Sequence, residues 1–362
     1  ALEQVRGALE RSSHLLQRSS PQHQIELDLM RAELALARSE REAIHSFATS
    51  ALTACAQGKA QENRRQLSAR AQHLLARVAR FEGSQDAASA LLERARADAS
   101  GELTIEVDVL LQRAEIAMDN HDFDRATSLA RQARERAGEL GSRRRAALAS
   151  DLLARHRWRL GEVRRARAIY QEVLAPAIRA MRDDLEVIAQ CGLGELALFE
   201  DELGVARVHL ERALEVHEGF EDERSERIHG LLGVLAHREG SQDLALSHTR
   251  RALALATCRE EARGIARWRA LEADISFDLG ERVSAEEQWG SVLEDAPPLL
   301  LGAERELYWN IRVNMARQYH LASDSERAWE IIGGVVQEIE EAGVMAGPQL
   351  AHALRLASTS FG

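Results

Sequence analysis

The feature that most constrains this chain is a ladder of small residues at fixed spacing. Seven times a small residue is followed twelve positions later by an alanine, and seven positions after that by a small or β-branched residue. The sets are Ala76/Ala88/Ala95, Ala114/Ala126/Ala133, Ala154/Ala166/Val173, Gly194/Ala206/Ala213, Gly233/Ala245/Ala252, Ala273/Ala285/Val292 and Ala316/Ala328/Val335. Because the sets recur every 38 to 43 residues, they predict a helical repeat array.

The composition supports helices throughout. Alanine, leucine, arginine and glutamate dominate, and all four favour helices. Five prolines and the lack of a sustained Val/Ile/Thr alternation argue against strands. We therefore expect an all-α fold in which each unit is two antiparallel helices.

Residues 185–217 illustrate the expected unit. Ala206, Leu210 and Ala213 fall on one face of the second helix, at i, i+4 and i+7. Gly194 and Ala206 should lie where the two helices cross, since small side chains let the backbones approach. A leucine at Ala206 should overpack this crossing and cost about 1–3 kcal/mol.

The turn within each unit is predicted five residues before the ladder alanine. Gly83, Gly161, Gly240 and Gly280 hold that place in four units, and glycine closes a helix in the left-handed conformation without steric cost. The other three units have His121, Asp201 and Ser323 there. Those turns should differ or be slightly strained.

The ladder and turns together resemble the tetratricopeptide repeat (TPR). Leu232-Gly233, Gly240, Ala245 and Ala252 carry the pattern in one unit, and Ala316, Tyr319, Ala328 and Val335 carry it in another. Pro297 falls where that family often ends its second helix. The resemblance covers about residues 66–341, and it implies a right-handed superhelical solenoid with a concave binding groove. Spacing near 40 exceeds the standard unit of about 34 residues. This long-repeat variant resembles the helical-repeat regions of maltose-regulator-like transcriptional activators and multidomain signalling proteins.

We expect one helical-repeat domain over residues 1–362. Residues 66–341 form seven regular repeats, and residues 21–60 form a divergent repeat in which Ala32 faces Ala43 at a spacing of eleven. Residues 1–18 are predicted as the trailing helix of an upstream segment, and residues 347–362 as a C-terminal capping helix. Since the chain starts at Ala1, we expect it to be a region of a larger protein. Of its 47 basic residues only Lys59 is lysine, a bias typical of GC-rich genomes, so we expect a bacterial source.

Charge and cysteine content limit the partners. A net charge of −11 argues against direct nucleic-acid binding, which requires a basic face. Cys55, Cys191 and Cys258 are far apart without metal-ligand spacing, so we expect helix-buried free thiols in the cytoplasm. No apolar run approaches the roughly 18 residues of a membrane span.

The sequence contains no catalytic signature. Gly192-Leu193-Gly194 lacks the third glycine and the preceding strand of a dinucleotide site, so helix packing is the preferred interpretation. His229 and His237 lie eight residues apart without further ligands at metal-binding spacing. We therefore predict no enzyme activity, no cofactor and no metal.

The TPR resemblance implies that first-helix residues just before, beside and beyond each ladder residue line the groove. Those positions are Arg77 and Arg80, Glu115 and Asp119, Arg155, Trp158 and Arg159, Glu195, His237 and Arg238, Asp274 and Asp278, and Arg317 and His320. The partner-binding candidates are Arg77, Arg155, Trp158, Arg159, His237, Arg238, Arg317 and His320, centred on Arg155, Trp158 and Arg159. Alternating charge could select a complementary peptide, or it could merely keep a helix face solvated. For Trp158, core packing is the competing interpretation.

An arginine-rich band crosses the third regular repeat. Residues 143–167 hold nine arginines and one histidine against Asp151 and Glu162. The band could dock an acidic partner segment, or its arginines could pair with acids of adjacent repeats such as Glu195 and Glu186.

The favoured function is a protein- or peptide-binding scaffold, or a regulatory-sensor region, within a bacterial signalling or transcription-regulating protein. Two alternatives stay open: a small-molecule sensor and a self-assembling scaffold that forms homo-oligomers.

Overall fold

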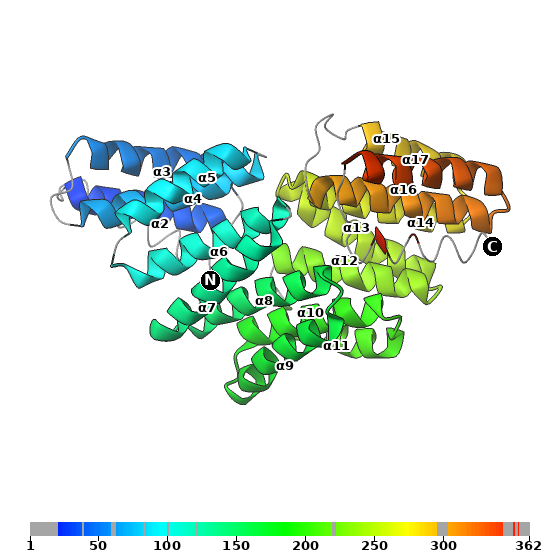
Figure 1. Ribbon diagram of the computed structural model, residues 1–362, viewed down its shortest axis with the longest axis horizontal. Coiled ribbons are helices and arrows are strands. Elements are labelled where there is room, and N and C mark those ends of the chain that lie inside the picture. The colour runs from blue at the N-terminus through cyan, green and yellow to red at the C-terminus, as the bar shows by residue number, and fades with distance from the viewer. Residues whose placement is uncertain are drawn as a thin grey trace. The chain divides into compact units, whose positions relative to one another are not determined.

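The computed structural model describes residues 21–37, 40–58, 63–82, 84–99, 101–120, 122–218, 222–294, 303–342, 350–351 and 354. These residues form sixteen helices and no strand (Figure 1). The helices are α2 (Pro21–Ala37), α3 (Arg41–Ala56), α4 (Arg64–Phe81), α5 (Gln85–Asp98), α6 (Leu103–Asp119), α7 (Phe123–Glu139), α8 (Arg143–Arg159), α9 (Val163–Arg179), α10 (Asp183–Phe199), α11 (Leu203–Val216), α12 (Glu223–Arg238), α13 (Gln242–Cys258), α14 (Ala262–Asp278), α15 (Arg282–Glu294), α16 (Ala303–Leu321) and α17 (Ser325–Ala342). The predicted all-α repeat fold is confirmed.

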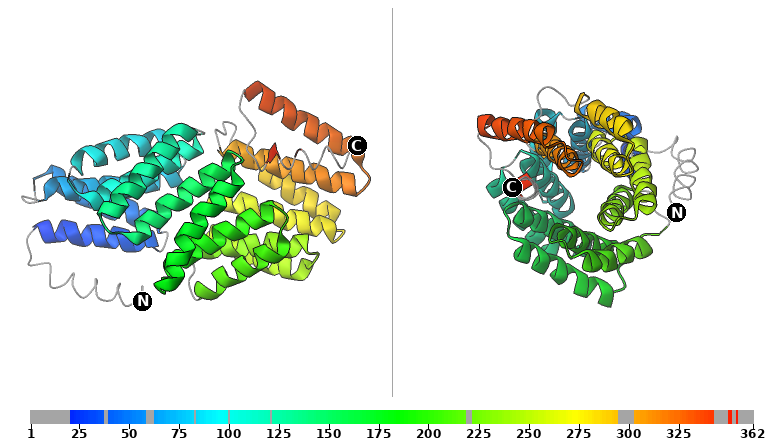
Figure 2. Two further views of the ribbon diagram at one scale, coloured as in Figure 1. Left: turned by 60° about the horizontal axis from the view of Figure 1, so that its bottom comes forward. Right: turned by 90° about the vertical axis from the view of Figure 1, so that its right-hand side faces the viewer.

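The chain divides into two compact units. Unit 1 comprises Ala1–Ala117 and Phe123–Ala149, and unit 2 comprises Met118–Asp122 and Ser150–Gly362. In unit 1, α2 packs on α3 and α4 on α5. In unit 2, the pairs α10/α11, α12/α13, α14/α15 and α16/α17 pack in the same way (Figure 2). The first helices α10, α12, α14 and α16 also contact one another in succession, so they form a row.

The ladder residues lie at the helix crossings, as predicted. All of them are buried except Val173, which is half-buried. A Cβ added to Gly194 would lie 2.6 Å from Leu210 Cδ2 and 3.6 Å from the Ala206 carbonyl oxygen. Gly192 packs against the Tyr170 ring, so the Gly192-Leu193-Gly194 segment serves helix packing.

The register predicted for the divergent repeat is wrong by one residue. Ala43 is half-buried, whereas Ile44 is fully buried and lies twelve positions after Ala32. Ala51, seven positions further, is also fully buried. The repeat therefore keeps the regular spacing, with isoleucine in place of the ladder alanine.

The turns within the units share one backbone conformation. Gly161, Gly240 and Gly280 have φ of 76°, 76° and 87°, as predicted for helix-closing glycines. Asp201 and Ser323 adopt the same left-handed conformation, with φ of 60° and 67°. Of the two alternatives for these turns, mild backbone strain is the one observed.

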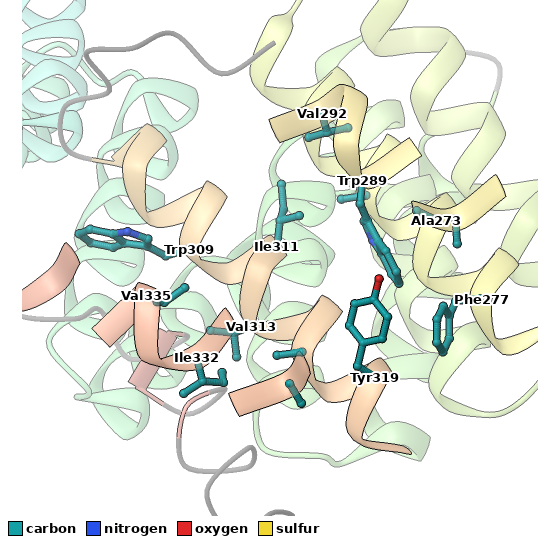
Figure 3. Packing of buried hydrophobic residues seen from close by; sticks show 14 of the residues in the cluster. Ala273, Phe277, Trp289, Val292, Trp309, Ile311, Val313, Tyr319, Ile332 and Val335 are labelled. Atoms are coloured by element: carbon teal, nitrogen blue, oxygen red, sulfur yellow. The ribbon is translucent and has the colours of Figure 1, made fainter. Parts of the chain in front are cut away.

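The core of the C-terminal pairs is built around aromatic rings. Trp289 is fully buried, and its ring centroid lies 5.4 Å from that of Phe277 and 6.3 Å from that of Tyr319 (Figure 3). Trp329, by contrast, is 52% exposed on α17. The cysteines are unpaired, but Cys258 is exposed, so the prediction of burial holds only for Cys55 and Cys191.

Several predictions fall outside the described residues. They concern the helix at residues 1–18, the turn residues Gly83 and His121, Pro297, and nearly all of the capping helix at residues 347–362.

Candidate functional site

The candidate site lies on the row of first helices in unit 2, where side chains of three successive repeats meet. Arg227 on α12 donates to Glu195 Oε2 on α10, and its Nη1 lies 3.8 Å from Asp151 Oδ1 on α8. Adjacent packed helices lie about 8–10 Å apart, so α8 and α12 would be roughly 16–20 Å apart in a flat row. Arg227 nevertheless contacts residues of both α8 and α10. The side chains of three successive first helices therefore converge at Arg227 on this face of unit 2.

Arg227 belongs to a closed network, here called the Arg227 network: Asp151, Arg155, Tyr170, Glu195 and Arg227. The Tyr170 hydroxyl donates to Asp151 Oδ1 at 2.8 Å, and Arg155 Nε lies 3.2 Å from Asp151 Oδ2. Burial alone would raise the pKa of Asp151, but the charges of Arg155 and Arg227 and the Tyr170 hydrogen bond outweigh it and lower this pKa. The two arginines and the Tyr170 hydroxyl thus hold Asp151 in its ionised form.

Arg267 on α14 occupies the same face without such a partner. It is half-buried and forms no hydrogen bond or ion pair with any described residue. Burial and the nearby charge of Arg263 lower its pKa, although Glu195 and Glu261 act in the opposite direction. Arg263, one turn earlier, lies 3.6 Å from Asp119 of the same unit.

A second polar group, here called the Asp274 cluster, comprises His237, Asp274, Asp278 and Arg317. Asp274 is 7% exposed and accepts a hydrogen bond from Trp289 Nε1 at 3.1 Å. Burial raises its pKa to about 7, against the Trp289 hydrogen bond and the charge of Arg317. His237 Nε2 lies 3.7 Å from Asp278 Oδ2. Arg317 forms no hydrogen bond or ion pair with the described part of the chain.

The candidates predicted at the centre of the groove are mostly engaged within the protein. Trp158 is 7% exposed and packs edge-on against Phe199, as the packing alternative expects, so its ring is not available to a partner in this structure. Arg155 belongs to the Arg227 network, and Arg159 lies 3.4 Å from the Met118 carbonyl oxygen.

The remaining candidates are divided between the units. Arg77, in unit 1, is half-buried and has no ion pair among the described residues. Arg238 donates to the Leu198 carbonyl and lies 3.9 Å from Asp201. His320 Nδ1 lies 3.2 Å from Ser325 Oγ. Whether these residues contact a partner stays a prediction.

Much of the arginine-rich band is neutralised inside the protein, although by other acids than predicted. Its ion pairs are Arg145–Asp108 in unit 1, and Arg155–Asp151, Arg157–Glu162, Arg165–Glu162, Arg167–Glu200 and Arg167–Glu202 in unit 2. The two acids predicted for this role pair elsewhere, Glu195 with Arg227 and Glu186 with Arg212.

Arg227 and Arg267 are not among the residues predicted from the sequence. Both lie six positions before a ladder residue, Gly233 and Ala273 respectively. The groove positions read from the ladder include the residue directly after the ladder residue. Arg227 and Arg267 each lie seven residues, or two helical turns, before such a residue, and therefore on the same helix face. Reading the face over its whole length, in both directions from the ladder, would have found both arginines.

Within the described residues, no helix is long and apolar enough to cross a membrane. The same residues contain no group of three or more His, Cys, Asp or Glu side chains that could hold a metal ion.

No family model and no curated protein sequence matches this chain. Solved structures do match it. A Rap protein complexed with competence and sporulation factor superposes with a TM-score of 0.66 at 12% identity, covering 97% of this chain and 94% of that one. NprR in complex with its cognate peptide NprX gives 0.62 at 13% identity, with 94% and 97% covered. The fold is a TPR-like helical solenoid.

The likeness at these identities concerns the fold alone. Aspartyl phosphate phosphatase F from Bacillus subtilis also matches, with a TM-score of 0.59 at 11% identity and coverage of 86% of this chain and 93% of that one. A fold shared by a peptide complex and a phosphatase does not decide between binding and catalysis.

Proposed function

We propose that this chain is a peptide-binding regulatory module, and that the concave face of the first-helix row in unit 2 holds the peptide. The observation that carries this proposal is that Arg227 on α12 contacts residues of two other repeats, Glu195 on α10 and Asp151 on α8. A face that gathers side chains from successive repeats suits a ligand that runs across the repeats, and an extended peptide has that shape.

The charge pattern on the face supports a peptide over an apolar ligand. Half-buried arginines alternate with carboxylates along the row, including Arg267 and Arg317, which lack ion pairs among the described residues. Such a pattern selects a ligand with complementary charges at defined positions. The peptide bound by NprR in its solved complex is consistent with this use of the fold.

The setting that we infer is a larger bacterial signalling or transcription-regulating protein, in which the array senses or recruits its partner in the cytoplasm. The long repeat spacing and its resemblance to the helical-repeat regions of maltose-regulator-like activators support this inference. We further infer that the module acts by binding and not by catalysis.

The first test is selection of peptides from a random display library on the purified chain, with fluorescence polarisation to measure their affinity. We expect enrichment of related sequences. If no peptide is enriched, while sugars or nucleotides raise the melting temperature, the module is a small-molecule sensor instead. If light scattering shows association that grows with concentration, self-assembly is the better account.

The second test locates the bound peptide. A photo-crosslinking benzoylphenylalanine replaces Val234, half-buried directly after the α12 ladder glycine, or Val208, 66% exposed on the second helix α11. We expect the selected peptides to crosslink at position 234 and not at position 208. The reverse pattern would place the peptide on the second helices and contradict the proposed face.

A further inference from the structure

Arg267 is held in place by the ring of Trp268, which follows it on α14 and packs against α12. Its guanidinium carbon lies 5.5 Å from the centre of the Trp268 ring. Trp268 is 3% exposed, packs with its six-membered ring against Gly230, and donates from Nε1 to Glu226 Oε1 at 2.9 Å. The indole is thus locked on α12, and it gives Arg267 a fixed platform.

The carboxylates that act on Arg267 are already engaged. Glu195 accepts a hydrogen bond from Arg227, and Glu261 accepts one from the backbone N–H of Gly264 at the start of α14. Glu226, below the indole, accepts from both Trp268 and Arg259. No carboxylate near Arg267 is therefore left to neutralise it among the described residues.

The arginines near Arg267 have acids of their own, whereas Arg267 has no ion pair among the described residues. Arg227 pairs with Glu195 and Asp151, and Arg263 pairs with Asp119. The charges of Arg263 and Arg227 lower the pKa of Arg267, whereas Glu195 and Glu261 raise it. A half-buried arginine loses part of its hydration, and without a partner it is destabilising. The environment therefore favours a negative group supplied from outside.

We infer that Arg267 is the anchor for a carboxylate of the bound peptide, with Arg263 beside it. This inference rests on the proposed peptide-binding function and names the group that the site selects. The planar guanidinium can donate two parallel hydrogen bonds to a carboxylate, and its position over Trp268 fixes the plane of that fork. The carboxylate belongs to an Asp or Glu side chain of the peptide or to its C-terminus.

The test uses peptides selected on the wild-type chain and measures their affinities by fluorescence polarisation. Arg267→Gln should weaken binding about tenfold, the usual scale for a charge-assisted pair that is half-exposed. Arg164→Gln is the matched control, since Arg164 is exposed on α9 and has no ion pair with described residues; its effect should stay below about twofold. Arg267→Lys keeps the charge without the fork and should give an intermediate loss.

Two changes to the peptide identify the carboxylate. Substituting its acidic residue with glutamine tests the side chain, and amidating its end tests the terminal carboxylate. The change that removes the anchored group should weaken wild-type binding about tenfold and have little further effect on Arg267→Gln. Arg267→Glu should regain affinity for a peptide with lysine in place of that acid.

The outcomes separate this inference from the proposed function. If peptides are selected and crosslink at position 234, but Arg267→Gln and Arg267→Lys bind them as tightly as the wild type, the anchor is refuted and the peptide-binding function stands. The anchor is also refuted if neither peptide change alters the affinity. If no peptide is selected, the proposed function and the anchor fail together.

Discussion

Arg227 and Arg267 hold the same position in consecutive units, six residues before the ladder residue of their first helix. Arg227 stabilises the fold, because it pairs with Glu195 and Asp151 on two other helices. Arg267 has no such partner among the described residues, although the same acid, Glu195, acts on it. One acid cannot fully serve both arginines. In this row of helices, the same repeat position is therefore ion-paired in one repeat and has no ion pair among the described residues in the next.

The largest expected effect is the loss of stability when Arg227 is removed. Arg227→Met leaves the largely buried Glu195 without its cation and Asp151 with Arg155 alone, which should lower the free energy of unfolding by about 3 kcal/mol. Arg267→Met should change it by less than about 0.5 kcal/mol or raise it, because no internal pair is lost. Urea denaturation followed by circular dichroism measures both. Equal losses for the two variants would remove the distinction between them.

The Asp274 cluster extends the comparison to a buried acid that lacks full compensation. The raised pKa of Asp274 means that the folded protein retains the Asp274 proton more tightly than the unfolded chain does. This contribution is therefore greatest at acidic pH and is lost as pH rises from about 4 to about 7. Asp274→Asn should remove that dependence and raise the free energy of unfolding by about 2 kcal/mol at pH 8.

Urea denaturation of wild type and variant from pH 4 to pH 8 tests this sign. The stability advantage of Asp274→Asn should grow with pH. Asp243→Asn, an exposed acid on α13, serves as the control and should show no such trend. A stability advantage of Asp274→Asn that shrinks as pH rises would contradict the burial effect.

A smaller effect is expected at the Tyr170 hydroxyl, which donates to the buried Asp151 of the Arg227 network. Tyr170→Phe keeps the ring on Gly192 and should cost about 1–2 kcal/mol, since the acid stays charged with one donor fewer. Tyr319→Phe is the matched control, because its hydroxyl donates to the more exposed Glu286. Thermal and urea denaturation should show the larger loss at Tyr170; a larger loss at Tyr319 would show that the network adds little.

The smallest effect concerns two turns with the same left-handed backbone. Asp201→Gly should relieve strain and stabilise the protein by about 0.5–1 kcal/mol, whereas Gly240→Ala should destabilise it by a similar amount. No neighbour lies within 4 Å of a Cβ at Gly240, so backbone strain alone is tested. Thermal melting of both variants would show opposite shifts, and shifts of the same sign would contradict the strain argument.

Local spacing made the fold predictable. The ladder predicts where helices cross, because a crossing as close as that of Gly194 with Ala206 tolerates only small side chains. The divergent repeat shows the limit of this rule. Ile44 is too large to match a rule based on small residues, although its burial and spacing fit the ladder.

The candidate site was less predictable, because charge pairing depends on how the first helices of successive repeats pack together. The repeat pattern places Arg155, Glu195 and Arg227 on first helices, but it does not show that Arg227 reaches α8. It also could not decide that Trp158 packs against Phe199 or that Trp329 is exposed. These outcomes depend on how successive repeats stack, which the ladder constrains only at the crossings.

The most direct test of the distinction between the two arginines is to observe their Nε–Hε groups by NMR while a selected peptide is added. Arg227→Gln and Arg267→Gln assign the two signals. We expect the Arg267 signal to shift and become protected from exchange with water at saturating peptide, because a carboxylate then accepts its hydrogen bonds, while the Arg227 signal stays in place. An unchanged Arg267 signal in the presence of bound peptide would contradict the account.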